Sequence, residues 1–504
     1  MALTVSTNTG ALMAQAAASS VNKDMESSIQ RLSTGKRINS AADDAAGVAI
    51  ASRMEASYRG LNQAIRNATD AQALINTAEG AQIETTSILQ RMRELAVQSI
   101  NDTNSTEDRL ALNNEITQLQ AELTRIADTT TWAGIKLLDG TFITKSFQIG
   151  AEADQTLTLS QDDMRPSALG AHRIDSTAVT AAASTTATNT LTGTSITVLG
   201  KDGDAAAAVT AGDSAKLLAG AVNTDTSSTG VTAKAHTALK ITLSGDPTST
   251  VSMTLSGGGT AVSIVASVTD NADLTELLTV INTNSSTTGV TAEFNGTDKS
   301  AIILRESDGD DITIEGFTVT TGGGTALTAT ITKQSNFAGT AFTTGATLTS
   351  TDSVGAGNDS TVATGVVRME STKSFTYSGS TGATTTGYTG SSASGVSSLS
   401  KISALSVASQ ANAESALGVI DGAIQMVNNS RGALGAYSNR LDSTISNLTN
   451  ISNETQASAG RITDADFAAE TTALVKAQIL QQASTAMLAQ ANASKQNVLS
   501  LLQG

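Results

Sequence analysis

The 504-residue sequence contains no cysteine, two prolines and two histidines. Without cysteine the chain has no disulfide framework, no thiolate zinc site and no cysteine nucleophile. Aromatic residues make up only 3% of the sequence and charged residues 15%, where about 25% charged residues is usual. Because so few large side chains are available, the composition favours thin layers and small packed units over one thick core.

The chain also lacks an excess of basic residues and any long apolar run. Its formal net charge of −16 argues against nucleic acid or an anionic membrane as a partner, because phosphate groups are bound by basic patches. No stretch of about 20 apolar residues is present to cross a bilayer. Residues 1–20 lack the basic start and the apolar run of a cleaved signal peptide. We therefore expect either a cytosolic protein or one that is exported without a cleaved signal.

Both ends of the sequence carry apolar residues at alternating steps of three and four. The clearest run, at residues 417–452, is typical of a coiled-coil seam and predicts one long C-side helix. Similar runs at 54–95 and 112–126 predict a long N-side helix and a shorter helix that runs back beside it, with a capping box from Ser105 to Asp108. None of these helices can bury its apolar seam alone, so we expect the two ends of the chain to pack together.

Two further segments, at residues 12–34 and 473–501, show the same spacing with seams rich in alanine and serine. Each of these helices buries little apolar area, and burial is worth about 25 cal/mol per Å². We expect both to be poorly ordered in an isolated subunit and to fold on association. After the bundle, the stretch GIKLLDGTFITKSFQIG predicts a β-hairpin that turns at Asp139-Gly140.

Helical spacing fades between residues 176 and 399, where threonine, serine, glycine and alanine dominate. Residues 217–243 are echoed by residues 277–306, and each copy places TGVTA between an apolar helical pattern and strand-like runs. This repeat predicts two related outer modules, each built from a short helix, a turn and strands. The more degenerate stretch 322–399 is expected to complete the outer sheets or to form a flexible surface.

The predicted fold class is α+β multidomain. It has paired N- and C-terminal coiled-coil helices, a helical bundle with a β-hairpin, and outer β-rich modules inserted in the middle. We place an inner terminal-helix domain at 1–44 plus 460–504, the bundle domain at 45–175 plus 400–459, and a variable outer region at 176–399.

Short motifs in the outer region have ordinary structural interpretations. The acidic segments RESDGDDITIEG (305–316) and GKDGD (200–204) resemble loose calcium loops, but they lack the ligand order of a calcium loop, so acidic hairpin turns are favoured. The glycine runs at 256–260 and 321–325 are not followed by the Lys-Ser/Thr pair of a phosphate-binding loop, so we interpret them as turns.

Little in the sequence points to catalysis. With only His172 and His236 and no cysteine, a nucleophilic triad is possible only in a trivial sense, and we expect surface or junction histidines. The HExxH pair of a metallopeptidase is absent from the sequence. We therefore expect no cofactor, no metal site and no enzymatic activity.

One conspicuous polar patch remains, RLSTGKRINSAADDAAGVAIASRM at residues 31–54. In one interpretation it is a polar link between two helices, where each exposed ion pair contributes less than about 1 kcal/mol. In the other, its charges lie at a subunit–subunit interface, where they fix the register and reject wrong partners. The charged residues concerned are Arg31, Lys36, Arg37, Asp43 and Asp44.

This patch is similar to the N-terminal signature of bacterial flagellin, and the stretch that begins RITDADFAAETTALVKAQIL at residue 461 resembles the C-terminal flagellin signature. The resemblance covers roughly residues 1–170 and 400–504. The two TGVTA units resemble the IN-type repeats of flagellins and filament-cap proteins. One departure is Lys495, where many members of the family have proline; the effect is expected to be local, because lysine leaves a helix continuous.

The resemblance implies a structural subunit that self-assembles into the helical flagellar filament used for swimming. It implies export of the unfolded chain through the flagellar type III apparatus and a secreted, extracellular location. The implied partners are copies of itself, an export chaperone, and hook-associated and cap proteins, with no nucleic acid or membrane. The alternative within the family is the hook–filament junction protein, and an adhesin-like role of the outer modules is compatible with either.

The resemblance also assigns candidate site residues. The subunit-interface candidates are Arg31, Leu32, Lys36, Arg37, Asn39, Asp43, Asp44, Leu480, Met487, Val498 and Leu501. The stretch LQRMRELAVQS (89–99) resembles the patch by which a Toll-like receptor of the host senses many flagellins, which makes Gln90, Arg91, Leu95 and Glu115 candidates for recognition. The stretch VLSLL (498–502) resembles the segment that intracellular flagellin sensors read.

Overall fold

The computed structural model describes residues 7–176, 184, 187, 189, 195–245, 249–296, 298–321, 328–349, 359–379 and 394–503. The chain divides into two compact units. The first contains Met1–Ile75, Thr144–Ser160 and Gly435–Gly504, and the second contains Asn76–Ile143 and Gln161–Leu434.

Long helices dominate both ends of the sequence and confirm the helical predictions made for them. No helix among the described residues combines the length and the apolar character that a bilayer crossing needs. Helix α9 continues through Lys495, as expected for lysine at that position. The long helices are α1 (Thr9–Thr34), α2 (Ala45–Ile100), α3 (Thr106–Thr129), α8 (Gln410–Thr463) and α9 (Phe467–Gln503).

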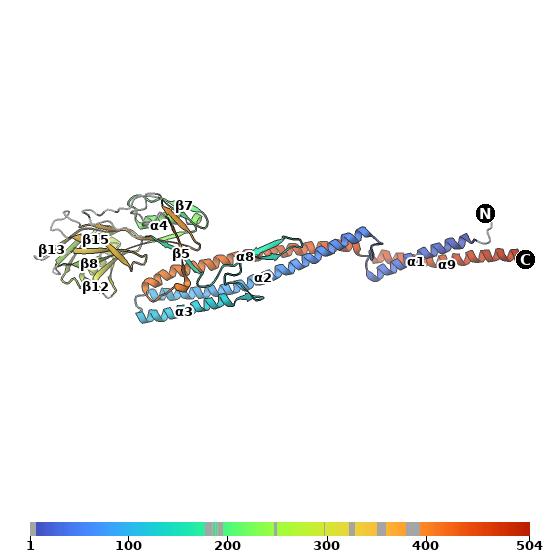
Figure 1. Cartoon of the computed structure of the whole chain (residues 1–504), viewed down its shortest axis with the longest axis horizontal. Coiled ribbons are helices and arrows are strands. Elements are labelled where there is room, and N and C mark those ends of the chain that lie inside the picture. Colours follow the sequence, from blue (N-terminus) through green and yellow to red (C-terminus); the bar gives the residue numbers. More distant parts are fainter. Residues whose placement is uncertain are drawn as a thin grey trace. The chain divides into compact units, whose positions relative to one another are not determined.

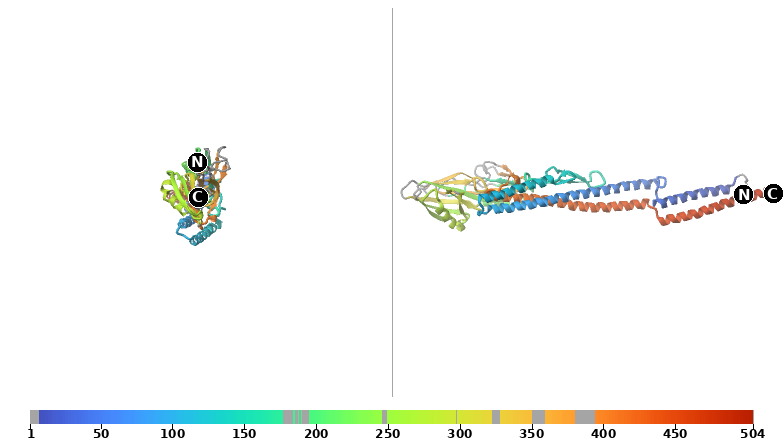
Figure 2. Two further views of the ribbon diagram at one scale, coloured as in Figure 1. Left: turned by 90° about the vertical axis from the view of Figure 1, so that its left-hand side faces the viewer. Right: turned by 90° about the horizontal axis from the view of Figure 1, so that it is seen from below.

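In the first unit, α1 lies beside α9, and the N-terminal part of α2 lies beside the C-terminal part of α8 (Figure 1, Figure 2). The pairing of α2 with α8 is thin. Leu61 and Ala64 pack on Leu448, and Ser452 Oγ donates to Asn62 Oδ1 at 2.9 Å. The predicted pairing of the two chain ends is therefore present in this unit.

The first unit also contains a β-hairpin made of β3 (Lys145–Gln148) and β4 (Thr156–Leu159). It is fixed to α2, because Asn67 Nδ2 donates to the carbonyl of Gln148 at 3.0 Å. Gly60 allows the close approach, since a Cβ there would lie only 3.2 Å from the Cβ of Ala151.

The second unit contains a helical bundle made of the C-terminal part of α2, the whole of α3 and the N-terminal part of α8. The predicted capping box opens α3: Asp108 N donates to Ser105 Oγ at 3.2 Å, and Ser105 N donates to Asp108 Oδ2 at 3.0 Å. The fully buried large side chains of the three helices are Leu89, Met92, Leu95, Ile116, Leu123, Ile420 and Val427.

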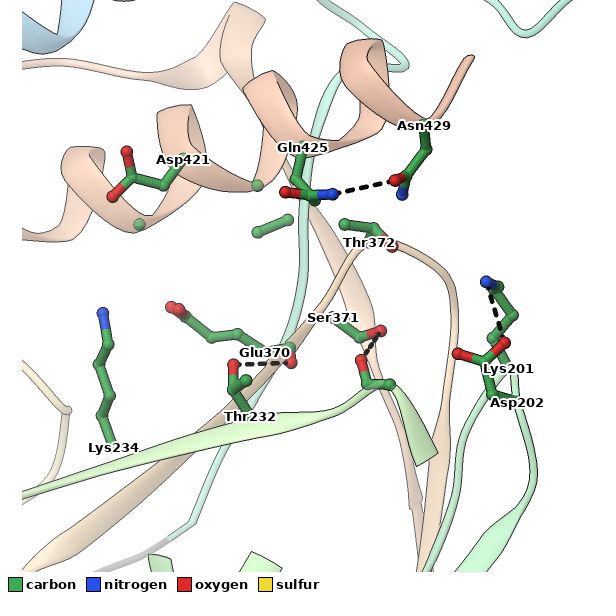
Figure 3. Close-up of a pocket in the computed structure, with 14 residues that line it drawn as sticks. Lys201, Asp202, Thr232, Lys234, Glu370, Ser371, Thr372, Asp421, Gln425 and Asn429 are labelled. Carbon is green, nitrogen blue, oxygen red and sulfur yellow. Dashed lines mark hydrogen bonds and ion pairs between the residues drawn. The ribbon is translucent and has the colours of Figure 1, made fainter. Parts of the chain in front are cut away.

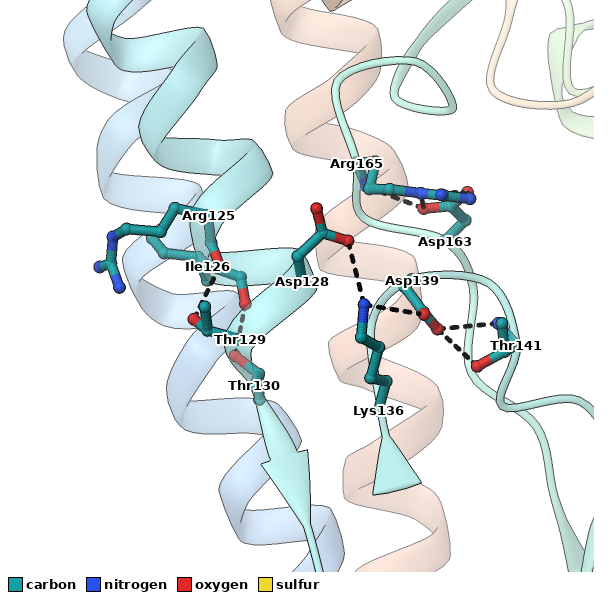
Figure 4. A network of polar contacts seen from close by, with 10 residues as sticks. All are labelled: Arg125, Ile126, Asp128, Thr129, Thr130, Lys136, Asp139, Thr141, Asp163 and Arg165. Atoms are coloured by element: carbon teal, nitrogen blue, oxygen red, sulfur yellow. Dashed lines mark hydrogen bonds and ion pairs between the residues drawn. The ribbon is translucent and has the colours of Figure 1, made fainter. Parts of the chain in front are cut away.

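The prediction of a hairpin that turns at Asp139-Gly140 is wrong. The short strands β1 (Thr131–Trp132) and β2 (Ile135–Lys136) turn earlier, at Ala133-Gly134, and the next hairpin is that of β3 and β4. Asp139 instead accepts hydrogen bonds from the backbone N and the Oγ1 of Thr141, at 3.0 and 2.6 Å (Figure 4). These bonds lower the pKa of Asp139, and Lys136 Nζ, 3.7 Å away, adds to the effect.

The outer part of the second unit is rich in strands, and the 13-residue strand β8 (Thr232–Ser244) runs through it. The N-terminal part of β8 pairs with β17, and its C-terminal part pairs with β12 and β14. The largest sheet has the order β11-β12-β8-β17-β5-β20, with β14 and β15 beside β8; two four-stranded sheets have the orders β10-β9-β13-β16 and β19-β18-β6-β7.

The bounds of the remaining elements are as follows. The strands are β5 (Gly170–Asp175), β6 (Ile196–Leu199), β7 (Asp204–Ala207), β9 (Ser249–Gly257), β10 (Val262–Val268), β11 (Thr291–Asn295), β12 (Asp298–Glu306), β13 (Ile312–Thr321), β14 (Thr328–Gln334), β15 (Phe342–Thr349), β16 (Thr361–Ala363), β17 (Val366–Ser371), β18 (Thr376–Gly379), β19 (Ser394–Val396) and β20 (Ser398–Lys401). The short helices are α4 (Ala215–Thr224), α5 (Thr226–Thr229), α6 (Thr275–Thr283), α7 (Ser285–Thr288) and the 3₁₀ turn η1 (Ile402–Ala404).

The sequence repeat becomes a structural repeat. In the first copy the side chain of Asn223, at the end of α4, exchanges two hydrogen bonds with the backbone of Ala233, at 2.7 and 2.8 Å. In the second copy Asn282, at the end of α6, makes the same pair with Ala292, at 2.8 and 2.9 Å. The two copies belong to separate hydrophobic cores, one around α4 and one around α6.

The predicted turns have different outcomes. Residues 200–204 join β6 to β7 and residues 256–260 join β9 to β10, so both hairpin turns are confirmed. Residues 305–316 do not form a hairpin, because β12 and β13 belong to different sheets and the segment crosses between them. In the second glycine run, residues 322–325 lie outside the described residues. Strands β14 to β20 show that the described parts of 322–399 complete the outer sheets.

Candidate functional site

Two polar links lie together in the first unit. The N link is residues 35–44, between α1 and α2, and the C link is residues 464–466, between α8 and α9. Lys36 and Asp464 form a β-bridge. Arg37 N donates to the carbonyl of Thr463 at 2.6 Å, and Ala465 N donates to the carbonyl of Gly35 at 3.0 Å. The two stretches that carry the sequence signatures therefore meet, although more than 400 residues separate them in the chain.

The basic residues of the N link also reach the C-terminal helices. Arg37 Nη2 donates to the carbonyl of Ile462 at 2.8 Å. Arg31 Nη1 lies 3.8 Å from Glu470 Oε2 in α9. Gly35 ends α1 in the left-handed conformation with φ 71°, which turns the chain into the link without a Cβ penalty.

The acidic residues of the N link act as local caps. Asp43 Oδ2 accepts from the backbone N of Ser40 at 2.8 Å and of Asn39 at 3.1 Å, and these bonds lower the pKa of Asp43. Asp44 Oδ1 accepts from Gly47 N at 2.8 Å at the start of α2. In the C link, Asp466 Oδ1 accepts from Ala468 N at 2.9 Å at the start of α9. The polar-link interpretation of this patch is therefore confirmed, and several of its charges already have partners inside the chain.

The α1–α9 pair beyond the links buries very few side chains. Among the described residues of the two helices, only Ser28 and Ala477 are fully buried. Polar contacts set the register: Gln481 Nε2 donates to Asn22 Oδ1 at 2.9 Å, and Asn8 Nδ2 donates to the carbonyl of Ala491 at 3.3 Å. The small side chains of the seam bring the helices together without removing much apolar surface from water.

Large apolar side chains of the same helices remain exposed. Leu480 is 45% exposed and Met487 is 64% exposed, and both were predicted as interface residues. The others are Leu12, Met13, Ile29, Phe467, Val475 and Ile479. Sequence reasoning placed Ile29 on the apolar seam of residues 12–34 but named none of these six as interface residues. A signal for them is present in the sequence. Alanine and serine fill the seam of these helices, so most of their large apolar residues must lie outside the seam and need another partner.

Three other predicted interface residues are less informative. Leu32 is partly buried at the end of α1. Val498 and Leu501 belong to α9, but their side chains lie outside the described part of the structure.

The residues assigned to host recognition lie in the bundle of the second unit. Gln90 and Arg91 are exposed and Glu115 is partly exposed. Arg91 donates to Glu115 at 2.9 Å and to Glu94 at 3.0 Å, which connects α2 to α3. Leu95 is only 1% exposed and belongs to the bundle core. The structure therefore contradicts Leu95 as a contact residue.

The histidines and the acidic segments form no metal centre among the described residues, which hold no group of three or more His, Cys, Asp and Glu side chains suited to one. His236 lies in β8 and is largely enclosed; burial lowers its pKa to about 4, and the charge of Arg305 adds to the effect. His172 lies in β5, and burial lowers its pKa as well.

Comparison with known proteins matches the two ends of the chain to one family. Residues 5–143 match the model of the bacterial flagellin N-terminal helical region, and residues 417–502 match that of the bacterial flagellin C-terminal helical region. The B-type flagellin of Pseudomonas aeruginosa is 39% identical over 506 residues, with both proteins covered completely. Flagellin C of Vibrio cholerae serotype O1 is 35% identical over 502 residues, again with complete coverage of both.

Among solved structures, that of FliC from Burkholderia pseudomallei is 19% identical and covers 73% of this chain and 99% of its own, with a TM-score of 0.28. At that score the superposition supports no conclusion about this chain.

Proposed function

Because this chain belongs to the bacterial flagellins, a family of structural proteins of the flagellar filament, we propose that it polymerises through the exposed apolar side chains of α1 and α9. The observation that carries this proposal is the set of eight large apolar residues exposed on the two helices, from Leu12 to Met487. Soluble monomers rarely leave large apolar patches in water, and such surfaces mark interaction sites.

The free energy at stake suits a polymer. Fully burying one Leu, Ile, Val, Phe or Met side chain is worth about 1.5–3 kcal/mol, and those on α1 and α9 are already about half buried, so each contributes on the order of 1 kcal/mol on assembly. Association of two proteins costs about 4–15 kcal/mol in lost motion. One pairwise contact is therefore marginal, whereas a subunit that touches several neighbours gains enough.

We propose that the contact between subunits is heterologous and does not close. Such a contact generates a helical tube rather than a closed ring.

We further propose export of the unfolded chain and assembly outside the cell. The absence of cysteine and the presence of only two prolines support this proposal, since neither disulfides nor slow proline isomerisation then impede unfolding and refolding. An export chaperone, hook-associated proteins and a cap protein are the proposed partners.

Seeded growth of purified protein tests the proposal. We expect Ile479→Gln combined with Met487→Gln to raise the critical concentration for growth about tenfold or more, because two buried apolar contacts are lost for each subunit. Val396→Gln is the matched control, since Val396 is 68% exposed in β19, outside both helices. Equal growth of both variants, with unchanged helical content, would show that α1 and α9 do not carry assembly.

The same assay separates the filament subunit from the hook–filament junction protein. A filament subunit elongates filament seeds indefinitely. A junction protein binds at the end of the hook and does not add repeatedly to its own kind, so wild-type protein that never elongates seeds would favour the junction role.

Recognition by a host Toll-like receptor is a second proposal, now limited to Gln90, Arg91 and Glu115. The exposure of Gln90 and Arg91 and the partial exposure of Glu115, on neighbouring helices, support it. We expect Arg91→Ala to weaken receptor signalling by monomeric protein, whereas Arg125→Ala, on an exposed part of α3, leaves it unchanged. Equal signalling by both variants would refute this assignment.

A further inference from the structure

A cavity of about 360 Å³ lies in the second unit beside the first turns of α8. Its walls come from β5, from β20 and the turn η1 that follows, and from α8 itself. Nothing in the proposed assembly uses this cavity, and its chemistry differs from that of the rest of the molecule.

The cavity is cationic in an acidic protein. Arg173 and Lys401 both line it, and no Asp or Glu among the described residues does, although the chain as a whole carries a net charge of −16. Glu370 pairs with Arg173 but is not part of the wall, so Lys401 carries the positive charge of the lining that is not paired. A site built in this way attracts a negatively charged group.

The side chain of Arg173 has a fixed position in the wall, because the residue is only 6% exposed and two other residues bind its guanidinium group. Its Nη2 lies 2.7 Å from Glu370 Oε1, and its Nη1 donates to the carbonyl of Ser415 at 2.9 Å. Its Nε has no hydrogen-bond partner among the described residues. A buried charged donor without a partner is unusual and costly, so the guanidinium beside the cavity is not fully compensated by the protein, although Nε itself is enclosed.

Two further donors of the lining are free. Lys401 forms no ion pair with any described residue and is exposed at the end of β20. The side-chain amide of Asn412 has no partner either, and its backbone N donates to Ser409 Oγ at 3.3 Å in the first turn of α8. The N-terminal turn of a helix favours a negative group through its backbone dipoles.

Apart from Ser400, Ser406 and Ser415, the rest of the lining is apolar, with Leu405, Ala416 and Val419 on the wall. A bare inorganic anion would leave these side chains uncovered, whereas an organic acid covers them with its apolar part. We propose that this cavity binds a small organic carboxylate, with the carboxylate held by Lys401 and the Arg173 side of the wall and the apolar part against Val419.

A neighbouring cavity of about 460 Å³ provides the comparison. As Figure 3 shows, both signs of charge line it, with Lys201 and Lys234 accompanied by Asp202, Glu370 and Asp421. Because its three acidic side chains outnumber its two lysines, it does not select an anion. Lys234 is exposed like Lys401, so it supplies a matched control.

The test uses the full-length monomeric protein with benzoate as the probe and benzamide as its neutral counterpart. Binding is followed through the methyl resonances of Leu405 and Val419. We expect benzoate to shift both resonances to saturation and benzamide not to compete. Lys401→Gln is expected to weaken benzoate binding about tenfold, as for the loss of one charge-assisted hydrogen bond, while Lys234→Gln leaves binding unchanged.

Three results would overturn the proposal: no saturable shift at tens of millimolar benzoate, equal binding of benzoate and benzamide, or equal effects of the two lysine variants. A fourth is a shift of the same resonances that depends on protein concentration and persists without benzoate. That result would assign the cavity to an acidic side chain of a second copy. None of these outcomes bears on filament growth, which is measured separately.

Discussion

Replacing Asp311 by asparagine is expected to stabilise the outer part of the second unit, and to do so much more at pH 8 than at pH 5. Asp311 directly precedes β13. Its Oδ2 accepts from Asn189 Nδ2 at 2.6 Å, and its Oδ1 is buried with no hydrogen-bond partner among the described residues. Burial raises the pKa of Asp311 from 3.8 to about 7; the charge of Asp310 adds to this rise, and the bond from Asn189 opposes it.

The sign of the effect follows from the two pKa values. In the unfolded chain Asp311 ionises near pH 3.8, and in the folded chain near pH 7. The folded state therefore loses stability as the pH rises between these values, and the loss is complete above pH 7. At about 1.4 kcal/mol for each pKa unit, the total is at most about 4 kcal/mol, of which about 3 kcal/mol falls between pH 5 and pH 8.

Asparagine removes the ionisation but keeps an oxygen for Asn189. Its amide then places a donor where Oδ1 has no partner, and an unsatisfied buried donor costs about 1–3 kcal/mol. The protonated carboxyl of the wild-type protein carries a similar unmet donor at pH 5. With the unmet donors about equal, the variant is already more stable by about 1 kcal/mol at pH 5, because Asp311 ionises in the unfolded wild type, and it is more stable by up to about 4 kcal/mol at pH 8.

The assay is denaturant unfolding of the full chain at both pH values, followed by circular dichroism of the β-rich transition. Asp308→Asn is the control, because the Asp308 side chain is 62% exposed and its partners, Lys216 Nζ at 3.3 Å and Ser307 Oγ at 3.4 Å, are at the surface. Other groups also titrate in this range, so the comparison is between variants at the same pH. If Asp311→Asn shows the same pH profile as the wild type, the buried-carboxylate reasoning is wrong.

Three further predictions concern the helices. Gly418→Ala is expected to destabilise the second unit by about 1–3 kcal/mol, because a Cβ there would press into Arg173 and lie 3.0 Å from Glu370 Oε1. In the control, Gly432→Ala in the same helix, the new Cβ meets no atom within 4 Å and the variant gains up to about 1 kcal/mol of helix propensity. Equal unfolding midpoints of the two variants would contradict this. Asp43→Lys removes the bonds to Asn39 and Ser40 and is expected to abolish seeded growth without changing the helical content of the monomer; normal filaments would refute the role of the N link. Limited proteolysis of dilute monomer is expected to trim α1 and α9 before α2 and α8, and equal resistance would show that the terminal pair is stable alone.

The helices and the repeat could be predicted because their signals are local. Met92, Ile116 and Ile420 each belong to the apolar spacing of a different helix, which indicates one buried face per helix, and all three are completely buried in the structure. Each copy of TGVTA follows a short helix whose last asparagine bonds to the alanine ten positions later, Asn223 to Ala233 and Asn282 to Ala292. The contact that defines the repeat is therefore local in the sequence. Periodicity and repetition are visible without knowledge of distant contacts.

The outer topology could not be predicted for the opposite reason. The acidic segment 305–316 contains turn residues, but nothing in it shows that β13 pairs with β9 while β12 pairs with β8. At Asp139-Gly140 the turn chemistry is present, yet Leu137 and Leu138 are both buried in the bundle. Two consecutive buried residues break the alternation of a half-exposed strand, so burial outweighs the hairpin signal.

The candidate site shows a similar division. The apolar rhythm that includes Met92 and Leu95 places Leu95 in a core, whereas the resemblance places it at a receptor surface; the structure follows the rhythm. For the polar patch, sequence reasoning identified the charges but not their partners, because Ile462, Thr463 and Glu470 lie more than 400 residues away. A link between helices needs caps, and Asp43 and Asp44 supply them.

The two kinds of interaction in the terminal helices have separate consequences. Hydrogen bonds of the paired links, together with Asn22–Gln481, determine how α1 lies on α9, and their free energy is available in a single subunit. Apolar burial is not, because the alanine- and serine-rich seam covers little surface and leaves Ile479 and Met487 in water. The links therefore define a register that one subunit can only weakly maintain, and the apolar side chains stabilise that register once neighbours cover them. It follows that variants of the exposed apolar residues should order α1 and α9 only at the raised protein concentration at which they assemble, whereas Asp43→Lys in the N link should fail to assemble although its apolar residues are intact.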